Sequence, residues 1–351
     1  MSTERSFATE VGLLRLKEGE IFRGEGILAV TKALLQSGVS YVGGYQGAPV
    51  SHLLDIMVDA EELMAELGVH VETCTNEAAA AAMLGASINY PLRGAVTWKS
   101  IVGTNVAADG LSNLSSPGVK GGALIITGED YGEGSSVIQE RTHAVAMKSS
   151  VWLLDPRPDL SRIVDLVEHG FSLSEASSTP VIMGLRGRAC HVQGEFTARG
   201  NVTPEISVRN KLSEPATFDY GRLAHPPATF EQEKLKVAER LPAAQSYIVE
   251  NGLNEVFAGD LERVGIILQG GLYNTVLRRL NVMGLADAFG GTRVGLLVLN
   301  VVHPLVADQI ADFCRGKEAV LVLEEGNPEF IEYQINAILR RTGSATRLAG
   351  K

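Results

Sequence analysis

Cysteine is scarce in this sequence of 351 residues, and its distribution excludes several kinds of site. The three cysteines, Cys74, Cys190 and Cys314, lie far apart and form no C-x-x-C pair. A structural zinc site or an iron–sulfur cluster held by this chain alone is not expected, because both need several closely spaced thiolates. A disulfide scaffold is not expected either, so we predict a cytoplasmic, reducing location.

Long apolar segments and basic clusters are also missing. The longest apolar runs, such as VGIIL and VGLLVLNVV, have the length of strands, and the N-terminal MSTERSFATE has no apolar signal core. The formal net charge is −10, and no block of lysine and arginine stands out. We therefore expect neither a membrane protein nor a protein that binds nucleic acid through its phosphates.

The common cofactor and catalytic motifs are absent as well. The sequence contains no G-x-x-x-x-G-K-S/T phosphate loop, no G-x-G-x-x-G after the first predicted strand and no G-x-S-x-G at a strand end. These absences argue against P-loop nucleotide binding, dinucleotide binding and α/β-hydrolase chemistry.

Short apolar runs alternate instead with helical patterns, which predicts an α/β fold with a parallel sheet. Strands are expected over residues 39–45, 69–74, 93–99, 121–128, 151–155 and 179–185. Helices are expected over residues 25–38, 51–67, 76–88, 104–114, 135–149 and 158–176. The strands are almost continuously apolar, which is typical of a sheet covered on both faces.

The alternation stops near residue 190 and resumes later, which predicts two α/β domains. We expect a first domain over residues 1–190, a linker and a charged helix over residues 191–257, and a smaller domain over residues 258–351. In the smaller domain, strands are expected over residues 263–271, 293–299 and 318–326, and helices over residues 272–285, 304–316 and 328–343.

In an open parallel sheet, ligands bind where the strands end and the helices begin. The first such turn is GGYQGAPVS, residues 43–51. Its glycines permit close backbone approach, Pro49 stiffens the turn, and Ser51 is placed to cap the next helix. A plain tight turn followed by a capped helix explains the same residues.

The next two turns carry single charged residues. Glu77 opens a run of alanines in TNEAAA, where an acidic residue also complements the helix dipole. Lys99 follows a strand in TWKSIVGTN, and a lysine beside a helix start suggests an anion site. A favourable helix start and a solvated lysine remain the structural alternatives, and Asp109 and Asn113 are expected on a solvated or interfacial helix face.

The fourth turn, GEDYGEGSSVIQERTH, combines glycines with four acidic residues and one histidine. It could form a mobile active-site loop or a paired-carboxylate site, but Gly-rich acidic loops are more often only solvated. His143 has no second histidine at metal-binding spacing, so we expect a structural role for it. The acidic residues are Glu129, Asp130, Glu133 and Glu140.

The order of these turns resembles the 2-oxoacid:ferredoxin oxidoreductases. GYQGAPVSHLLD resembles the GYPGTPSSE turn of that family. The long string from NEAAAAAMLGAS through KSIVGTNVAAD and GVKGGALIITGEDYGEGSS is similar to the alpha subunit of indolepyruvate ferredoxin oxidoreductase. ILQGGLYNTV and VLEEGNPEFIE are similar to the second domain of that subunit, so the resemblance covers most of residues 20–350.

The resemblance implies a thiamine diphosphate enzyme whose coenzyme lies between two domains. This chain would supply the pyrimidine-binding domain and a transketolase-C-like domain, while a partner domain would hold the diphosphate through Mg²⁺. Glu77 matches the family's glutamate, which hydrogen-bonds the pyrimidine ring nitrogen opposite the 4′-amino group. That bond favours the imino tautomer, which removes the proton from the thiazolium carbon.

The same mapping assigns further binding residues. Gly47, Pro49 and Ser51 would line the cofactor or substrate. Lys99 and Asn105 would face the thiazolium side and bind the substrate carboxylate.

Several departures from the family pattern limit the mapping. Ala48 stands where the family usually has threonine, Gln46 replaces a proline, and the histidine expected before the serine pair is replaced in GEGSS. These departures leave room for a substrate other than indolepyruvate, and the low aromatic content does not decide between aryl and branched 2-oxo acids. The chain also lacks a GDG…N metal–diphosphate motif and a cysteine cluster.

The sequence thus predicts one subunit of an oxidoreductase that converts a 2-oxo acid and coenzyme A into acyl-CoA and passes electrons to ferredoxin or a similar acceptor. Iron–sulfur clusters would belong to partner subunits, in a hetero-oligomer with two copies of this chain. A split, non-oxidative 2-oxoacid decarboxylase is the first alternative. A non-catalytic assembly subunit is the second, suggested by Ala48 and the missing histidine and opposed by Glu77.

Overall fold

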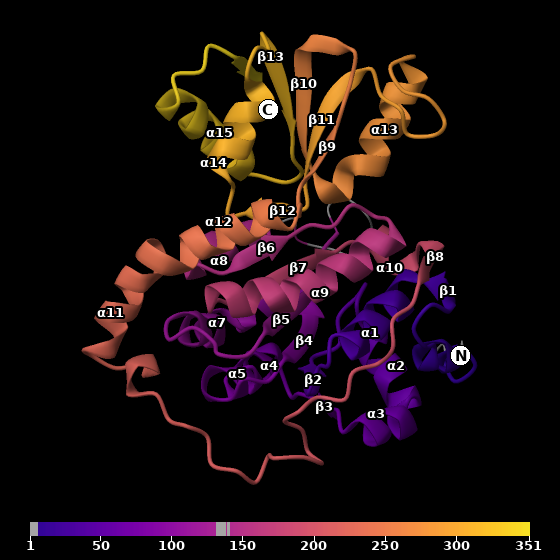
Figure 1. The fold of residues 1–351 in the computed structure, drawn as a ribbon, viewed down its shortest axis with the longest axis vertical. Coiled ribbons are helices and arrows are strands. Elements are labelled where there is room, and N and C mark those ends of the chain that lie inside the picture. Colours follow the sequence, from indigo (N-terminus) through magenta and orange to yellow (C-terminus); the bar gives the residue numbers. More distant parts are fainter. Residues whose placement is uncertain (1–5, 131–137, 139–140) are drawn as a thin grey trace.

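The computed structural model describes residues 6–130, 138 and 141–351. Figure 1 shows two α/β units stacked along the long axis of the molecule, each built around its own sheet. Both sheets are largely parallel, as the alternating pattern predicts.

The larger sheet has seven strands in the order β12-β6-β7-β5-β4-β2-β3. All neighbours are parallel except β12, which pairs antiparallel with β6. The strands are β2 (Tyr41–Gly44), β3 (His70–Thr73), β4 (Gly94–Lys99), β5 (Ala123–Gly128), β6 (Trp152–Leu154), β7 (Val181–Leu185) and β12 (Val301–His303).

Helices cover both faces of this sheet, and alternate residues of each central strand face different cores. Leu124 and Ile126 of β5 pack into one hydrophobic cluster, and Ile125 between them packs into another. Burial on both faces explains why the central strands are apolar at every position. The helices are α1 (Gly26–Gln36), α2 (His52–Asp59), α3 (Glu61–Leu67), α4 (Glu77–Met83), α5 (Ala86–Asn89), α6 (Ser100–Val106), α7 (Ala108–Ser115), α8 (Thr142–Ser149), α9 (Leu160–Ser177) and α10 (Gly187–His191).

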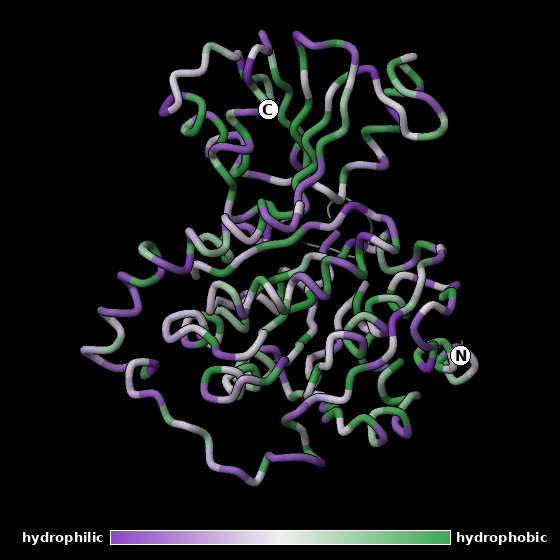
Figure 2. Tube along the Cα trace, viewed as in Figure 1, coloured by the Kyte–Doolittle hydropathy of each residue, from purple (hydrophilic) through white to green (hydrophobic). Residues whose placement is uncertain are grey.

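The smaller sheet has five strands in the order β14-β13-β10-β11-β9, and only β9 is antiparallel to its neighbour. Figure 2 shows hydrophobic residues along its strands and hydrophilic residues on the outer loops. The strands are β9 (Glu255–Phe257), β10 (Leu261–Gln269), β11 (Val294–Leu299), β13 (Ala319–Leu323) and β14 (Arg347–Ala349). The helices are η4 (Gly270–Leu272), α13 (Tyr273–Val282), α14 (Ala307–Cys314) and α15 (Phe330–Arg341).

Four predicted helices are shorter than expected or divided. The helix expected over residues 104–114 is divided at Ala107 between α6 and α7. The helix expected over residues 51–67 is interrupted at Ala60, whose backbone leaves the helical region (φ −101°, ψ 25°). The helix expected over residues 76–88 is divided between α4 and α5. The helix expected over residues 135–149 begins only at Thr142, because Arg141 has an extended backbone (φ −113°, ψ 133°).

The segment expected to be a linker contains a strand. β8 (Gln193–Thr197) pairs antiparallel with β1 (Ile21–Glu25), and the rings of Phe22 and Phe196 stack 4.7 Å apart. Each strand buries little more than its phenylalanine, so neither shows the apolar pattern by which strands are recognised.

After β8, the chain runs around the outside of the larger unit before it reaches the long helical segment (Figure 1). That segment consists of α11 (Ala228–Leu235), a π-helical stretch η3 (Lys236–Arg240) and α12 (Leu241–Glu250). Two short 3₁₀ helices, η1 (Val11–Arg15) and η2 (Tyr220–Arg222), complete the described elements. Among the helices described, none has the length and apolar character needed to cross a bilayer.

Candidate functional site

The carboxyl ends of β2, β4 and β5 lie side by side in the larger sheet. Gly44 pairs in register with Thr97, and Lys99 pairs with Gly128. The turns that leave these strands therefore meet at one edge of the sheet, where ligands of parallel α/β folds bind.

The turn after β2 packs directly on the ends of β4 and β5. A Cβ atom added to Gly47 would lie 2.6 Å from Cβ of Lys99 and 2.7 Å from its backbone nitrogen. A Cβ atom added to Gly128 would lie 2.6 Å from Cδ of Pro49, and the peptide bond before Pro49 is cis. A side chain at Gly47 or Gly128 would therefore collide with its neighbours. Gly47 and Pro49 lie against the ends of β4 and β5, and Gly47 contacts Lys99.

The expected helix cap at Ser51 is wrong. The half-buried Ser51 precedes α2, but its side chain makes no capping hydrogen bond. Its backbone is already helical (φ −50°, ψ −42°), whereas a capping serine normally has an extended backbone that directs its oxygen toward the following amides.

Glu77 is the first residue of α4, and its side chain is buried. Oδ1 of Asn76 caps this helix by accepting a hydrogen bond of 2.9 Å from the backbone nitrogen of Ala79. Glu77 itself is 6% exposed and packs against Gly103 of α6. A Cβ atom on Gly103 would lie 2.9 Å from Cγ of Glu77 and 2.5 Å from Cδ1 of Trp98.

Within the described residues, the Glu77 carboxylate has no hydrogen-bond or ion-pair partner. The side chain is largely buried, but its oxygens are not among the fully enclosed atoms that lack a partner, so the carboxylate keeps some contact with solvent and most of its hydration is not replaced by protein donors. Such a group is expected to have a ligand as its partner.

Lys99 and Asp130 form a second polar group at the ends of β4 and β5. Nζ of Lys99 lies 3.6 Å from Oδ2 of Asp130, which is an ion-pair distance but too long for a hydrogen bond. Oδ1 of Asp130 accepts a hydrogen bond of 2.8 Å from the backbone nitrogen of Gly187.

Several buried polar atoms at these strand ends have no hydrogen-bond partner among the described residues. They are Nζ of Lys99, Oδ2 of Asp130 and the hydroxyl oxygens of Thr97, Ser100 and Thr127. Because buried polar groups are normally satisfied, their concentration here indicates a place for a polar ligand or ordered water.

The remaining predicted residues lie away from this cluster or outside the described part. Asn105 is exposed on α6 and lines a neighbouring pocket. Asp109 and Asn113 are exposed on α7 and are joined by a side-chain hydrogen bond of 3.2 Å, which matches a solvated or interfacial face. Glu133 and Glu140 lie outside the described residues, so a paired-carboxylate loop stays a prediction.

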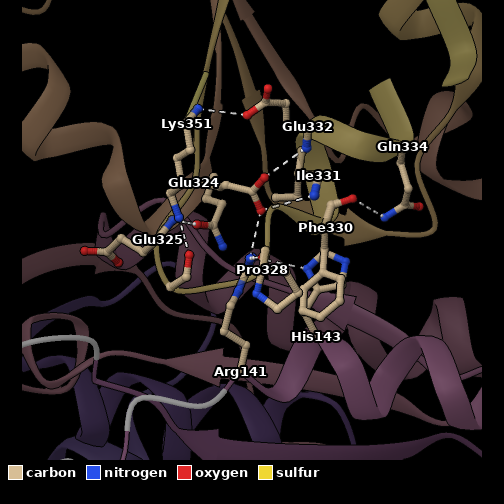
Figure 3. A network of polar contacts seen from close by, with 12 residues as sticks. Arg141, His143, Glu324, Glu325, Pro328, Phe330, Ile331, Glu332, Gln334 and Lys351 are labelled. Atoms are coloured by element: carbon tan, nitrogen blue, oxygen red, sulfur yellow. Dashed lines mark hydrogen bonds and ion pairs between the residues drawn. The ribbon is translucent and has the colours of Figure 1, made fainter. Parts of the chain in front are cut away.

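Arg141 and His143 connect the two units. Nη1 of Arg141 donates to Oε2 of Glu324 and to the backbone oxygen of Pro328, each at 2.8 Å. The His143 ring stacks on Phe330 with centroids 5.2 Å apart, and Figure 3 shows the two rings side by side above Arg141. Burial, with a smaller effect of the Arg141 charge, lowers the pKa of His143 well below its usual value.

No cluster of three or more potential metal ligands was found in the described part of the chain. The sequence contains no signal for the contact of Gly103 with Glu77 or for the ion pair between Arg141 and Glu324. Both join residues that are far apart in the sequence, so only the fold reveals them.

Known proteins are similar to this chain in sequence, and solved structures are similar to it in fold. Residues 253–347 match the model of the indolepyruvate ferredoxin oxidoreductase middle domain. The chain is 26% identical over 331 residues to indolepyruvate oxidoreductase subunit IorA of Methanothermobacter thermautotrophicus. It is also 26% identical over 336 residues to IorA of Pyrococcus abyssi.

The resemblance to indolepyruvate oxidoreductases is confirmed. These alignments cover 93% and 95% of this chain but 50% of each relative. The chain therefore spans about half the length of the curated IorA proteins that it matches.

Two solved structures share the fold. The 2-oxoglutarate:ferredoxin oxidoreductase of Magnetococcus marinus, with 2-oxoglutarate, coenzyme A and succinyl-CoA bound, superposes with a TM-score of 0.69 at 17% identity. That alignment covers 95% of this chain and 62% of the other. A split-gene transketolase in an inactive beta4 tetramer gives a TM-score of 0.55 at 14% identity, over 92% of this chain and 86% of the other.

Proposed function

We propose that this chain is the pyrimidine-binding subunit of a thiamine diphosphate-dependent 2-oxoacid oxidoreductase of the indolepyruvate type. The observation that carries this proposal is the buried Glu77 carboxylate, which has no partner among the described residues. A protonated nitrogen of the aminopyrimidine ring would supply the missing hydrogen-bond donor. The IorA relatives and the fold shared with a 2-oxoglutarate:ferredoxin oxidoreductase support the assignment to a 2-oxoacid oxidoreductase.

The residues around Glu77 fit this coenzyme. Gly47 and Pro49 pack the backbone of their turn against Lys99 and Gly128 at the strand ends, and we assign both residues to contacts with the cofactor or substrate. Nζ of Lys99 has unused donors for the substrate carboxylate. Ser51 and Asn105 are assigned supporting contacts with cofactor or substrate.

When bound, thiamine diphosphate supplies a nucleophilic carbon and an electron sink for decarboxylation. Glu77 would hold the proton on the pyrimidine nitrogen, and the wall formed by Gly103 and Trp98 would keep water from that carboxylate. Lys99 would orient the 2-oxo acid through its carboxylate. The net reaction converts a 2-oxo acid, coenzyme A and two oxidised ferredoxins into acyl-CoA, carbon dioxide, a proton and two reduced ferredoxins.

This reaction needs partner subunits. The sequence has no GDG…N motif, and its described part contains no metal-ligand cluster, so Mg²⁺ and the diphosphate would be held by a partner. We propose a hetero-oligomer with two copies of this chain, in which partners also carry the iron–sulfur clusters. The three buried free cysteines agree with a reducing cytoplasm.

Replacement of Glu77 by glutamine tests this function in the complex purified from the native host. Glu77→Gln keeps the shape of the side chain but cannot share a proton in the same way, so we expect turnover to fall at least 100-fold, roughly, as for loss of acid–base catalysis. Calorimetric titration should show weaker binding of thiamine diphosphate, while size-exclusion chromatography shows an intact complex.

Glu72→Gln is the matched control, because Glu72 is an exposed carboxylate on β3 that should not affect turnover. Unchanged activity and coenzyme affinity in Glu77→Gln would contradict the proposal. Iron analysis of the same complex separates the oxidoreductase, whose partners contain iron–sulfur clusters, from a non-oxidative decarboxylase without iron.

A further inference from the structure

Lys99 and Asp130 lie on the same face of the larger sheet, at the ends of two neighbouring strands. Lys99 is the last residue of β4 and pairs in register with Gly128 of β5. Side chains two residues apart along a strand direction point to the same face, and Asp130 lies two residues beyond Gly128. The distance of 3.6 Å between Nζ of Lys99 and Oδ2 of Asp130 agrees with this placement.

The Asp130 carboxylate is buried and fixed from the side of β7. Its side chain is only 2% exposed, and Oδ1 accepts a hydrogen bond of 2.8 Å from the backbone nitrogen of Gly187, the first residue of α10. A Cβ atom added to Gly187 would lie 3.1 Å from the same oxygen. One carboxylate oxygen is therefore anchored, and the other remains beside Lys99.

The Lys99 side chain is confined at both ends. Its Cβ atom lies under the turn at Gly47, and its ammonium group lies beside Asp130. Neither Nζ of Lys99 nor Oδ2 of Asp130 has a hydrogen-bond partner among the described residues. At 3.6 Å, Asp130 supplies a compensating charge but leaves the N–H groups of Lys99 able to bond another acceptor.

We propose that Asp130 is a positioning residue that holds the charged Lys99 side chain at the strand ends for the carboxylate of the substrate. This inference rests on the proposed function, in which Lys99 binds that carboxylate. A lysine side chain that is already fixed loses less conformational freedom when the substrate binds, so the substrate binds more tightly. Asp130 affects the substrate only through Lys99.

A purely structural role for Asp130 would depend on its hydrogen bond to Gly187 and not on its charge. Asp130→Asn separates the two roles, because asparagine keeps an oxygen that accepts this hydrogen bond and loses the negative charge. A buried ammonium group without a counter-charge is unfavourable, so Lys99 would leave its position in this variant.

The test compares KM and kcat for indolepyruvate in the complex purified from the native host. In Asp130→Asn we expect KM to rise about tenfold or more while kcat changes less than about threefold, as for a loss of substrate binding. Calorimetric titration with oxamate, an unreactive compound with the same carboxylate and carbonyl groups, should show a rise in Kd of similar size without any turnover.

A double-mutant cycle shows whether Asp130 acts through Lys99. Lys99→Met alone should raise KM and the Kd of oxamate, and Asp130→Asn added to Lys99→Met should change neither value further. The same fold-increase from Asp130→Asn with and without Lys99 would overturn the inference, because it would mean that Asp130 acts independently of the lysine.

Gly187→Ala is a second variant that keeps the charge of Asp130. Its added Cβ atom pushes against Oδ1 of Asp130, so KM should rise in the same direction as in Asp130→Asn. Asp260→Asn is the control, because Asp260 pairs with Arg293 at the surface of the smaller unit and should leave KM unchanged.

The outcomes separate this inference from the proposed function. An unchanged or lower KM in both Asp130→Asn and Gly187→Ala, in a complex that converts 2-oxo acids, overturns the role of Asp130 and leaves the proposed function intact. A wild-type complex that converts no 2-oxo acid overturns the proposed function and this inference with it.

Discussion

At the scale of the residue, the position of the Glu77 carboxylate depends on a neighbour that has no side chain. Gly103 lies on α6 and lets Trp98 and Glu77 pack against the same point of its backbone. The indole nitrogen of Trp98 donates a hydrogen bond of 3.1 Å to Oγ1 of Thr104, which fixes the ring in the wall. Glu77 and Trp98 are therefore tightly packed against α6, and Glu77 cannot change position without moving these neighbours.

Gly103→Ala is expected to displace Glu77 and Trp98. Its Cβ atom would lie below 3.0 Å from both side chains, and overpacking of this kind costs about 1–3 kcal/mol. We expect a lower unfolding midpoint in urea and a loss of turnover in the complex. Gly12→Ala is the control, since nothing lies within 4 Å of the added carbon. A Gly103→Ala variant as stable and active as the wild type would show that the packing is not needed.

At the scale of the element, strands with two buried faces are the ones that sequence patterns predict. β5 and β7 are buried at every position and apolar almost throughout, so both were expected. The sequence does not predict β1 and β8, because each strand buries little more than one phenylalanine and lacks the apolar pattern of a strand. The apolar spacing of α2 continues into α3, so the sequence predicts one continuous helix and contains no sign of the break at Ala60.

For the candidate site, the sequence predicts which turns carry the site residues but not the contacts between these turns and other elements. The turns around Gly47, Glu77 and Lys99 follow strands, and strand ends are where sites form, so their positions were expected. The involvement of Asp130 with Lys99 was not, because it results from packing between separate elements.

The end of β12 contains a histidine that makes stability depend on pH. Burial lowers the pKa of His303 from 6.5 to about 4, and its ring lies near that of His143, with Arg141 beside His143. At a pH between the unfolded and the folded pKa of His303, the imidazole binds a proton in the unfolded chain but not in the folded chain. Stability is therefore retained above pH 6.5 and lost as the pH falls toward 4.

The lowered pKa of His303 alone should make the free energy of unfolding about 2 kcal/mol smaller at pH 5 than at pH 7.5. Urea unfolding at the two pH values measures this difference. His303→Gln should reduce the difference between the two pH values. His70→Gln, at an exposed histidine on β3, should not. An equal pH dependence in wild type and His303→Gln would contradict the assignment.

At the scale of the whole molecule, the two units share both a core and a charged contact. One hydrophobic cluster contains Trp98 of the larger unit and Ile267 of the smaller. The ion pair between Arg141 and Glu324 joins the same units, and Glu324 also accepts hydrogen bonds from the first amides of α15. The relative placement of the units is thus fixed by packing and by polar contacts.

Glu324→Gln is expected to destabilise the molecule by about 3–5 kcal/mol, because it leaves the buried Arg141 charge without its counter-ion. Glu318→Gln is the control, since Glu318 pairs with Arg263 at the surface, where ion pairs contribute less than about 1 kcal/mol. The measurement is the unfolding midpoint in urea for both variants. Equal, small effects would mean that the buried contact does not hold the units together.

The position of β12 also has a consequence for the order in which the protein folds on the ribosome. The other six strands of the larger sheet are complete once residue 185 has been made, but β12, the edge strand beside β6, ends at residue 303. At roughly 5–20 residues per second, synthesis leaves that edge open for several seconds or more. During this interval the outer edge of β6 has no strand beside it, and it is covered only when residues 301–303 of the later segment have emerged.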